Sequence, residues 1–404
     1  MKFIHFADAH LDSPFRGLSF LPSKEFKQIY QAADQSLKKI VDLALAENVD
    51  LVLIAGDTFD SDKPSPRAQL FFAQQIKRLT DQNIQVVMIF GNHDHMKQED
   101  LLVSPSPYFK LLGNNEKVEQ ATFKTRNGFD YDVVGFSYLN NHITHDMVPD
   151  FPEKGKNYTF GLMHAQERAQ TNNVYAPFSV SEIQNLNYDY FALGHIHARM
   201  NLSEKPWIVY PGNIQGRHIN ELGEKGCYLG EIDENTGKTS ISFKKTGPIV
   251  WQGVEINLDS EISKTDLQTK IVSVLSEVKQ KTYFSLTIKG AQFLTEEERE
   301  LTQDTDFWQT ISQSLPFDSQ LVDVRYQINA SLKLNENDRV AFDKAKAEIF
   351  ASDEFSKIVN DWKKKDPEAA ALAENADFID DVKQLTEVKL MSRLKGINDE
   401  TETN

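Results

Sequence analysis

Histidine, aspartate and asparagine side chains follow five apolar segments of this sequence, each at the point where the apolar run ends. They are Asp8, His10, Asp57, Asn92, His93, His164, His195 and His197. A short apolar run bounded by polar residues is typical of a strand buried on both faces. Open α/β sheets carry their functional residues at such strand ends. Because these side chains offer nitrogen and oxygen but no thiolate, they predict a catalytic metal centre rather than a structural zinc site.

The spacing of these residues also favours metal binding. Asp8 and His10 are two residues apart, as are His195 and His197, and such pairs project to the same side of an extended segment. The Asp57 carboxylate lies between these pairs in the sequence and can bridge two cations. This mixture of oxygen and nitrogen ligands suits Mn, Fe, Mg or catalytic Zn, and the sequence does not distinguish among these metals.

Isolated histidines and aspartates need a different interpretation, because most of them are ordinary surface or hydrogen-bonded residues. We favour that interpretation for His5, His142, His145 and His218. We expect three further carboxylates to cap helices or turns, namely Asp12, Asp62 and Asp94. Of these, Asp94 is kept as a residue that orients a neighbouring side chain. The same interpretation of the strand-end histidines would require five coincidences.

The chain has 404 residues, which suggests two or three domains. Its single cysteine, Cys227, excludes an internal disulfide and fits a reducing compartment, where we expect it to be a small core residue. No apolar run approaches the roughly 20 residues that a membrane span needs. Asp8 and His10 interrupt the first apolar stretch before it could serve as a signal peptide. We therefore expect a cytoplasmic protein with no membrane partner.

The net charge of −16 is unusual for a protein that binds nucleic acid. Residues 1–250 contain 25 Lys and Arg against 30 Asp and Glu, whereas residues 251–404 contain 19 against 30. The acidity is therefore concentrated in the C-terminal part, while all ten histidines precede residue 251. Two divalent cations would make the predicted site locally positive whatever the charge of the whole chain.

Periodic apolar residues predict the main elements around the site. One helix is expected over residues 26–45, and a second opens at Pro66 and ends at Thr80. The second helix is expected to turn four side chains inward: Leu70, Ala73, Ile76 and Leu79. The loop over residues 96–108 is expected to end in a short helix to Leu112. Alternating segments follow as far as residue 243, so we predict two packed sheets flanked by helices.

Gly247-Pro248 marks a domain boundary. We predict a metal-binding domain over 1–248, a small α+β domain over 249–332, a helical segment over 333–396 and a disordered tail over 397–404. The small domain is expected to contain one long helix over about 296–315. The helical segment carries an apolar stripe made by Phe355, Ile358, Val359 and Trp362. This stripe could dock on a partner or pack on its own domain.

The order of the motifs resembles the calcineurin-like metallophosphoesterase superfamily. Asp-x-His, Gly-Asp-x-x-Asp, Gly-Asn-His-Asp, His164 and Gly-His-x-His follow one another over about residues 1–245. This resemblance implies a four-layer α/β/β/α sandwich with two divalent metals, manganese being the leading candidate. One metal would be held by Asp8, His10, Asp57 and His197. The other would be held by Asp57, Asn92, His164 and His195, with His93 as the catalytic histidine.

Finer features resemble the bacterial SbcD-type DNA repair exonucleases, and most closely their YhaO branch. They are the Gly-Asp-Thr-Phe-Asp run at 56–60 with Pro64-Ser65 after it, and the Asp-Ala-His-Leu-Asp-Ser-Pro-Phe run at 8–15. The resemblance implies a two-metal DNA exonuclease or endonuclease whose small domain caps the active site. It also implies a homodimer, for which the helix from Pro66 to Thr80 is our candidate surface. The C-terminal helices would dock on an SMC-like coiled-coil ATPase.

Residues around the ligands could orient them or contact substrate. Asp60, Asp94, Arg217 and His218 are our candidates for these roles. Possible phosphate contacts also include Arg16, Lys63, Arg67, Arg168 and Arg199. Two alternatives to a nuclease remain at this stage, a small-molecule phosphodiesterase or phosphatase and a scaffold without catalysis. A scaffold would be expected to lack a ligand or His93, and none of these residues is missing.

Overall fold

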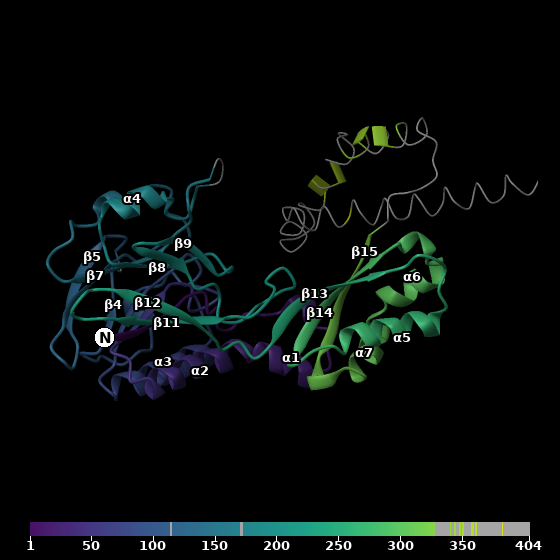
Figure 1. Cartoon of the computed structure of the whole chain (residues 1–404), viewed down its shortest axis with the longest axis horizontal. Helices are drawn as coiled ribbons and strands as arrows, with labels where there is room; N and C mark the ends of the chain where they lie inside the picture. Colours follow the sequence, from purple (N-terminus) through teal and green to yellow (C-terminus); the bar gives the residue numbers. More distant parts are fainter. Residues whose placement is uncertain are drawn as a thin grey trace, which may run out of the picture. The chain divides into compact units, whose positions relative to one another are not determined.

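The computed structural model describes residues 1–113, 115–169 and 173–327, together with scattered positions between residues 340 and 382. The chain divides into two compact units, Met1–Trp251 and Gln252–Asn404 (Figure 1). Each unit has its own sheet or sheets. Within the described ranges, no helix combines the length and apolar character that crossing a membrane requires.

The first sheet of the first unit has six strands in the order β12-β11-β1-β2-β3-β4. These strands are β12 (Thr239–Lys245), β11 (Gly226–Ile232), β1 (Lys2–Phe6), β2 (Leu51–Ala55), β3 (Gln85–Ile89) and β4 (Phe109–Leu111). The strands from β1 to β4 run parallel, while β11 and β12 are antiparallel to their neighbours. The carboxyl ends of β1, β2 and β3 therefore meet at one edge.

The second sheet has the order β5-β6-β7-β8-β10-β9. Its strands are β5 (Glu119–Lys124), β6 (Asp130–Gly135), β7 (Tyr158–His164), β8 (Tyr190–Gly194), β10 (Trp207–Tyr210) and β9 (Met200–Glu204). The four central strands are parallel, and both edge strands are antiparallel. The ends of β7 and β8 supply the second group of predicted ligands.

The two sheets pack face to face, and helices cover their outer faces. Strand β2 shows how, because Leu51, Leu53 and Ala55 face the second sheet while Val52 and Ile54 face the helices. The covering helices of the first sheet are α2 (Ala32–Ala46) and α3 (Pro66–Thr80), and the short helix α1 (Ser23–Tyr30) precedes α2. The short helix α4 (Val180–Asn185) and irregular segments cover the second sheet on the opposite side (Figure 1). The predicted four-layer α/β/β/α architecture is confirmed.

Helix α3 begins and ends where the sequence predicts, and it buries Ile76 and Leu79 as expected, but Leu70 lies outside its buried face. Ser65 Oγ accepts a hydrogen bond from Ala68 N at 3.3 Å, and Pro66 occupies the first turn. The helix buries Phe72 and Ile76, whereas the Leu70 side chain is 61% exposed. The prediction that Leu70 points inward is wrong. Leu70 and Phe72 are two residues apart, which places them on nearly opposite faces of a helix.

Two other local predictions differ from the structure. The helix predicted over residues 26–45 is broken at Gln31 into α1 and α2. The short helix predicted before Leu112 is instead strand β4, which pairs in parallel with β3. A three-residue strand carries too little periodic pattern to be distinguished from a helical turn. Short 3₁₀ turns lie at Arg16–Leu18, Gln98–Asp100, Val148–Asp150, Ala291–Phe293 and Pro316–Asp318.

Residues 250–327, nearly all of them in the second unit, form a three-stranded sheet and three α-helices. The strands are β13 (Val250–Asn257), β14 (Thr282–Lys289) and β15 (Gln320–Gln327), and the helices are α5 (Lys264–Leu275), α6 (Glu296–Gln303) and α7 (Thr305–Gln313). The single helix predicted over 296–315 is wrong. Asp304 has an extended backbone and its side chain accepts from Asp306 N, so it begins a new helix.

Most of the predicted helical segment over 333–396 and all of the tail over 397–404 lie outside the described residues. Within the apolar stripe, Ile358 is described as helical with a half-exposed side chain. Phe355, Val359 and Trp362 lie outside the described part of the chain. The role of the stripe therefore stays a prediction.

Candidate metal centre

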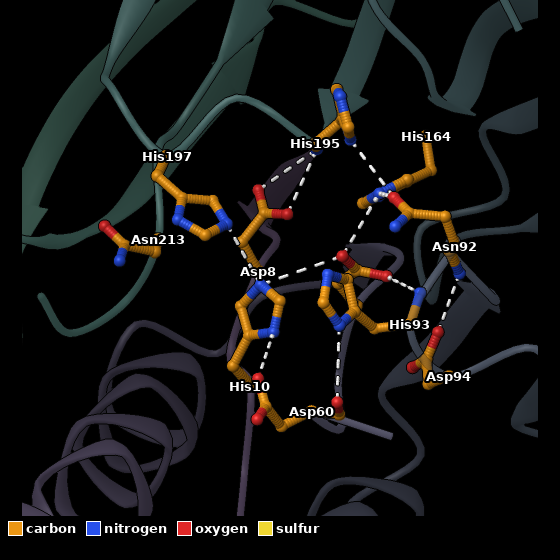
Figure 2. A network of polar contacts seen from close by, with 12 residues as sticks. Asp8, His10, Asp60, Asn92, His93, Asp94, His164, His195, His197 and Asn213 are labelled. Atoms are coloured by element: carbon orange, nitrogen blue, oxygen red, sulfur yellow. Dashed lines mark hydrogen bonds and ion pairs between the residues drawn. The ribbon is translucent and has the colours of Figure 1, made fainter. Parts of the chain in front are cut away.

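The predicted ligands come together where the ends of five strands meet between the two sheets (Figure 2). Asp8 and His10 follow β1, Asp57 follows β2, and Asn92 follows β3. His164 ends β7, while His195 and His197 follow β8. All of these side chains are buried except His195 and His197, which are partly exposed.

The backbone of several ligand residues adopts a conformation that side chains disfavour. The φ angles of Asp8, His10, Asp57 and His195 are 51°, 42°, 49° and 100°. Such a conformation costs on the order of 1–3 kcal/mol per residue and persists only where the surroundings enforce it. Asp8 N donates to Gly56 O at 3.1 Å and His10 N donates to Asp57 O at 3.0 Å. The ligand loops of β1 and β2 thus hold each other in the strained geometry.

Two glycines permit the close approach of the ligand loops. A Cβ on Gly91 would lie 2.2 Å from Asp57 Oδ1, and one on Gly56 would lie 2.6 Å from His164 Nδ1. Gly56 also has a φ of 85°, which glycine adopts without strain. Any side chain at either position would displace a predicted ligand.

The first half of the site brings together two imidazole Nε2 atoms, those of His10 and His197. His10 Nδ1 donates to Asp60 Oδ1 at 3.1 Å, and His197 Nδ1 donates to Glu221 Oε1 at 2.5 Å. Carboxylates only accept, so each neutral ring carries its proton on Nδ1 and a lone pair on Nε2. The two Nε2 atoms lie 3.0 Å apart. A cation held by both Nε2 atoms would resolve this contact, and His10 and His197 would be two of its ligands.

The second half has the same character. His164 Nδ1 donates to Ala55 O at 2.9 Å, and its Nε2 lies 3.0 Å from Asn92 Oδ1 and carries a lone pair when the ring is neutral. His195 Nδ1 lies 3.1 Å from the same amide oxygen. Converging acceptors of this kind fit a second cation, and carbonyl and imidazole donors suit divalent transition metals.

Asp57 lies between the two halves. Its Oδ2 is 3.7 Å from His10 Nε2 and 3.4 Å from His164 Nε2, while its Oδ1 accepts from His93 N at 2.9 Å. Both Asp8 carboxylate oxygens accept from His195 N, at 3.1 and 3.2 Å. Asp57 Oδ2 thus faces one imidazole nitrogen from each half of the site, as a bridging metal ligand must. Asp8, His10 and His197 form one group able to hold an ion, and Asp8, Asp57 and His164 form another.

These histidines differ in protonation. Burial lowers the pKa of His197, but the Glu221 carboxylate outweighs burial and raises that pKa. Burial lowers the pKa of His10 and of His195 to about 3, so both rings are neutral at physiological pH. Burial also lowers the pKa of His164, but the Asp57 carboxylate outweighs it and raises that pKa to about 9. A proton and a metal ion therefore compete for the His164 lone pair.

His93 differs from the ligands because its side chain is exposed. Its Nδ1 lies 3.3 Å from the carbonyl oxygen of Asp60, and its ring centroid is 4.9 Å from that of His10. The ring therefore stands at the open side of the site, beside the ligands (Figure 2). This is the position that a residue acting on bound substrate would need.

The buried Asp94 carboxylate holds two ligand loops together. Its Oδ2 accepts from Thr58 N at 2.7 Å and from Phe59 N at 3.3 Å, and its Oδ1 accepts from Gly91 N at 2.7 Å. These donors belong to the loops that carry Asp57 and Asn92. Asp94 is therefore placed to fix the distance between two predicted ligands, and it does not itself face the cluster in Figure 2.

The predicted phosphate contacts mostly have protein partners. Arg217 Nη1 lies 2.5 Å from Asp60 Oδ1, and His218 Nε2 lies 3.2 Å from Glu221 Oε1. Elsewhere in the first unit, Arg67 pairs with Asp34, Arg168 pairs with Asp146, and the Arg199 guanidinium lies 3.8 Å from the centroid of the Phe243 ring. Lys63 is exposed, and the side chain of Arg16 lies outside the described parts of the chain.

Glu221 is a site residue that the sequence did not indicate. Its side chain is 6% exposed and accepts four hydrogen bonds or ion pairs, including one from His197. Burial raises the pKa of Glu221, but the histidine partners outweigh burial and hold that pKa well below its usual range. No motif marks Glu221, and its nearest signal is the Pro-Gly-Asn turn at 211–213 upstream. Tyr175 was also missed, although its ring lies 4.4 Å from that of His195.

Comparison with known proteins identifies the family. Residues 1–199 match the model of the calcineurin-like phosphoesterase family. The uncharacterized metallophosphoesterase YhaO of Bacillus subtilis is 33% identical over 284 residues, which cover 70% of this chain and 69% of that protein. The chain belongs to the calcineurin-like phosphoesterase family. The resemblance inferred from the motifs is thus confirmed, and this metallophosphoesterase has histidine and aspartate groups able to bind metal.

More distant relatives are named for DNA repair. The DNA double-strand break repair protein Mre11 of Methanocaldococcus jannaschii is 27% identical over 286 residues, covering 67% of this chain and 73% of that protein. The Mre11 protein of Sulfolobus acidocaldarius is 27% identical over 294 residues, covering 69% and 71%. Among solved structures, a dimetal phosphatase from Danio rerio matches 57% of this chain and 92% of its own, at 11% identity and a TM-score of 0.35.

Proposed function

We propose that this metallophosphoesterase is a DNA nuclease, cutting phosphodiester bonds as an exonuclease or endonuclease in DNA repair. The observation that carries the proposal is the extent of its similarity to the Mre11 proteins. That similarity runs over 286 residues in one of them, well beyond the 199 residues that match the general family. A relationship limited to the metal-binding motifs would support phosphoester chemistry alone.

The proposed cofactors are two divalent ions, with manganese as the first candidate. Asp8, His10, Asp57 and His197 would hold one ion, and Asp57, Asn92, His164 and His195 would hold the other. The two groups of converging lone pairs, with one Asp57 oxygen between them, support this assignment. When bound, such ions polarise phosphoryl oxygens and lower the pKa of a coordinated water.

His93 is proposed as the catalytic histidine. Nδ1 of its exposed ring contacts the backbone carbonyl oxygen of Asp60 at 3.3 Å, which leaves Nε2 to donate a proton to the leaving oxygen. The backbone N–H of His93 donates to Asp57, so the loop that carries the proposed acid is also tied to the proposed bridging ligand. The remaining candidates, Asp60, Arg217 and His218, would act around this centre.

The proposed partners are DNA, an SMC-like coiled-coil ATPase and a second copy of the chain. For the homodimer, the candidate surface has two exposed leucines: Leu70 on α3, which is 61% exposed, and Leu102 on a later loop, which is 48% exposed. Leu102 N donates to Gln69 Oε1 at 3.0 Å, so the loop that carries Leu102 lies against this helix. For the ATPase, the apolar stripe that includes Ile358 is the proposed docking element.

The proposal is tested by Mn²⁺-dependent digestion of end-labelled duplex and single-stranded DNA, alone and with a candidate ATPase. Bis(p-nitrophenyl) phosphate and p-nitrophenyl phosphate serve as small-molecule substrates in parallel. Asp57→Ala and His93→Ala are the inactive variants, and His145→Ala, which alters another exposed histidine, is the control matched to His93→Ala. Cleavage of DNA that Asp57→Ala abolishes supports the nuclease. Turnover of only the small esters would instead favour a small-molecule phosphodiesterase or phosphatase.

A further inference from the structure

One buried carboxylate network surrounds only the first half of the candidate metal centre. His10 is held by Asp60, and His197 is held by Glu221. In the second half, His164 is held instead by the carbonyl oxygen of Ala55, which belongs to strand β2. The orientation of His164 therefore depends on sheet backbone, whereas the orientations of His10 and His197 depend on side chains.

Arg217 joins the two orienting carboxylates. Its side-chain Nη1 donates to Asp60 Oδ1 at 2.5 Å, the oxygen that also accepts from His10. Its backbone N donates to Glu221 Oε2 at 2.6 Å. Residues 60 and 221 are far apart in the sequence, and this one residue contacts both.

Glu221 also folds the loop in which it lies. Its Oε2 accepts from Asn213 Nδ2 at 2.7 Å as well as from the backbone of Arg217, while its Oε1 points to His197. The backbone carbonyl of His197 is held in turn by Lys225 Nζ at 2.9 Å and by Asn213 N at 3.2 Å. The loop between these residues and the His197 ligand are thus organised by the same buried charge.

We propose that Asp60, Arg217 and Glu221 form an orienting frame for one of the two metal positions, the one shared by His10 and His197. Asp60 and Glu221 fix the two rings so that both Nε2 lone pairs face one ion, and Arg217 keeps the two carboxylates in register. These are positioning residues, and Arg217 acts through Asp60 and Glu221 rather than as a substrate contact. The inference rests on the proposed metal ligands but not on the choice of DNA as substrate.

The test measures Mn²⁺ binding to the full-length, metal-stripped chain by calorimetry, with electron paramagnetic resonance to distinguish paired from isolated ions. Loss of an outer partner of a metal-bound histidine typically lowers metal affinity by about 10–100-fold. We expect Glu221→Ala and Asp60→Ala to lower the affinity for one of the two ions by that factor and to leave the affinity for the other unchanged. At intermediate Mn²⁺, the signal of coupled ions should give way to that of an isolated ion.

Conservative variants separate orientation from folding. Asp60→Asn keeps an oxygen that can accept from His10, so it should retain more of the affinity than Asp60→Ala. Arg217→Ala should lower the affinity for the same ion by about 10-fold, the lower end of that range. Arg78→Ala is the matched control, because Arg78 makes a comparable ion pair with Asp42, and neither residue belongs to the ligand network.

The outcomes distinguish failure of the orienting frame from failure of the proposed metal ligands. If the parent chain binds two ions and Glu221→Ala binds both with unchanged affinity, the frame is wrong while the ligands stand. If the parent binds no ion that depends on His10 and His197, both fail together. If Arg217→Ala keeps both affinities and raises only the KM for a phosphodiester, Arg217 is a substrate contact and its place in the frame is refuted.

Discussion

Replacing Asp94 by alanine should destabilise the first unit strongly. The substitution leaves three buried backbone donors without an acceptor, those of Thr58, Phe59 and Gly91. Each orphaned donor costs about 1–3 kcal/mol. Water can enter the space left by the carboxylate and relieve part of this cost, so we expect a total of about 3–5 kcal/mol. For a unit of this size, each kcal/mol lowers the melting temperature by about 2–4 °C, which gives a fall of about 6–20 °C.

The assay is thermal unfolding of the metal-free chain, in a chelator, so that loss of bound ions does not contribute. Asp94→Asn retains one oxygen, which can serve the two donors of the Asp57 loop, and it turns an amide N–H toward Gly91 N. We expect an intermediate loss of about 1–3 kcal/mol from that one orphaned donor. Asp62→Ala removes an exposed carboxylate from the same loop and should change stability by no more than about 0.5 kcal/mol. An Asp94→Ala variant that melts with the parent would show that these hydrogen bonds do not hold the loops.

Four further outcomes test the rest of the proposal. Asp57→Ala should release both ions, because its carboxylate faces both groups of donors; full two-metal occupancy by elemental analysis would contradict the bridging role. His93→Ala should keep both ions while turnover falls by roughly 10²–10⁴-fold, and cleavage at the parental rate would exclude His93 from catalysis. Leu70→Glu should convert the proposed dimer to a monomer in light scattering, so a parent that is already monomeric at micromolar concentration would refute the dimer. Trp362→Ala should weaken binding to the ATPase by at least roughly tenfold per 1.4 kcal/mol lost without changing the melting temperature. A large fall in melting temperature without the partner would indicate a core helix instead.

The ligand set could be predicted because each ligand sits in a local pattern. A buried strand followed by a polar residue places that residue at the sheet edge, whatever the rest of the chain does. Asp57 and His164 come from different sheets, yet each is recognisable from its own few neighbours. The pattern of a single segment was therefore enough to place every proposed ligand near the others.

The residues that orient the ligands could not be predicted in the same way. Glu221 contacts His197, which lies 24 residues earlier in the sequence, and Arg217 contacts Asp60, which lies 157 residues earlier. Such contacts depend on tertiary packing, and nothing in the neighbourhood of Glu221 in the sequence distinguishes it from a surface carboxylate. Arg217 was expected to meet phosphate for the same reason, since its partner lies in a distant segment.

The errors in the fold have a related cause. Leu70 continues the apolar spacing of Ile76 and Leu79, but tertiary packing centres the buried face on Phe72, Ile76 and Leu79 and leaves Leu70 exposed. The helix over 26–45 and the helix over 296–315 were each predicted as one element. Neither break contains a proline or glycine. Asp304 caps the next helix with its side chain, whereas Gln31 makes no side-chain cap, so only the break at Asp304 has a capping residue.

The charge of the site links metal binding to substrate binding. Five carboxylates lie in or against it, from Asp8, Asp57, Asp60, Asp94 and Glu221, and two basic side chains lie beside them, Arg217 and Lys225. His164 and His197, whose pKa values their carboxylate partners raise, add positive charge to this count, and burial raises the pKa of Asp94 to about 7. The metal-free centre therefore carries too little positive charge to attract a phosphodiester strongly. Two divalent ions would add four positive charges and make the centre positive. Under the proposed function, an acidic chain can therefore bind DNA phosphates at this centre because of its metals.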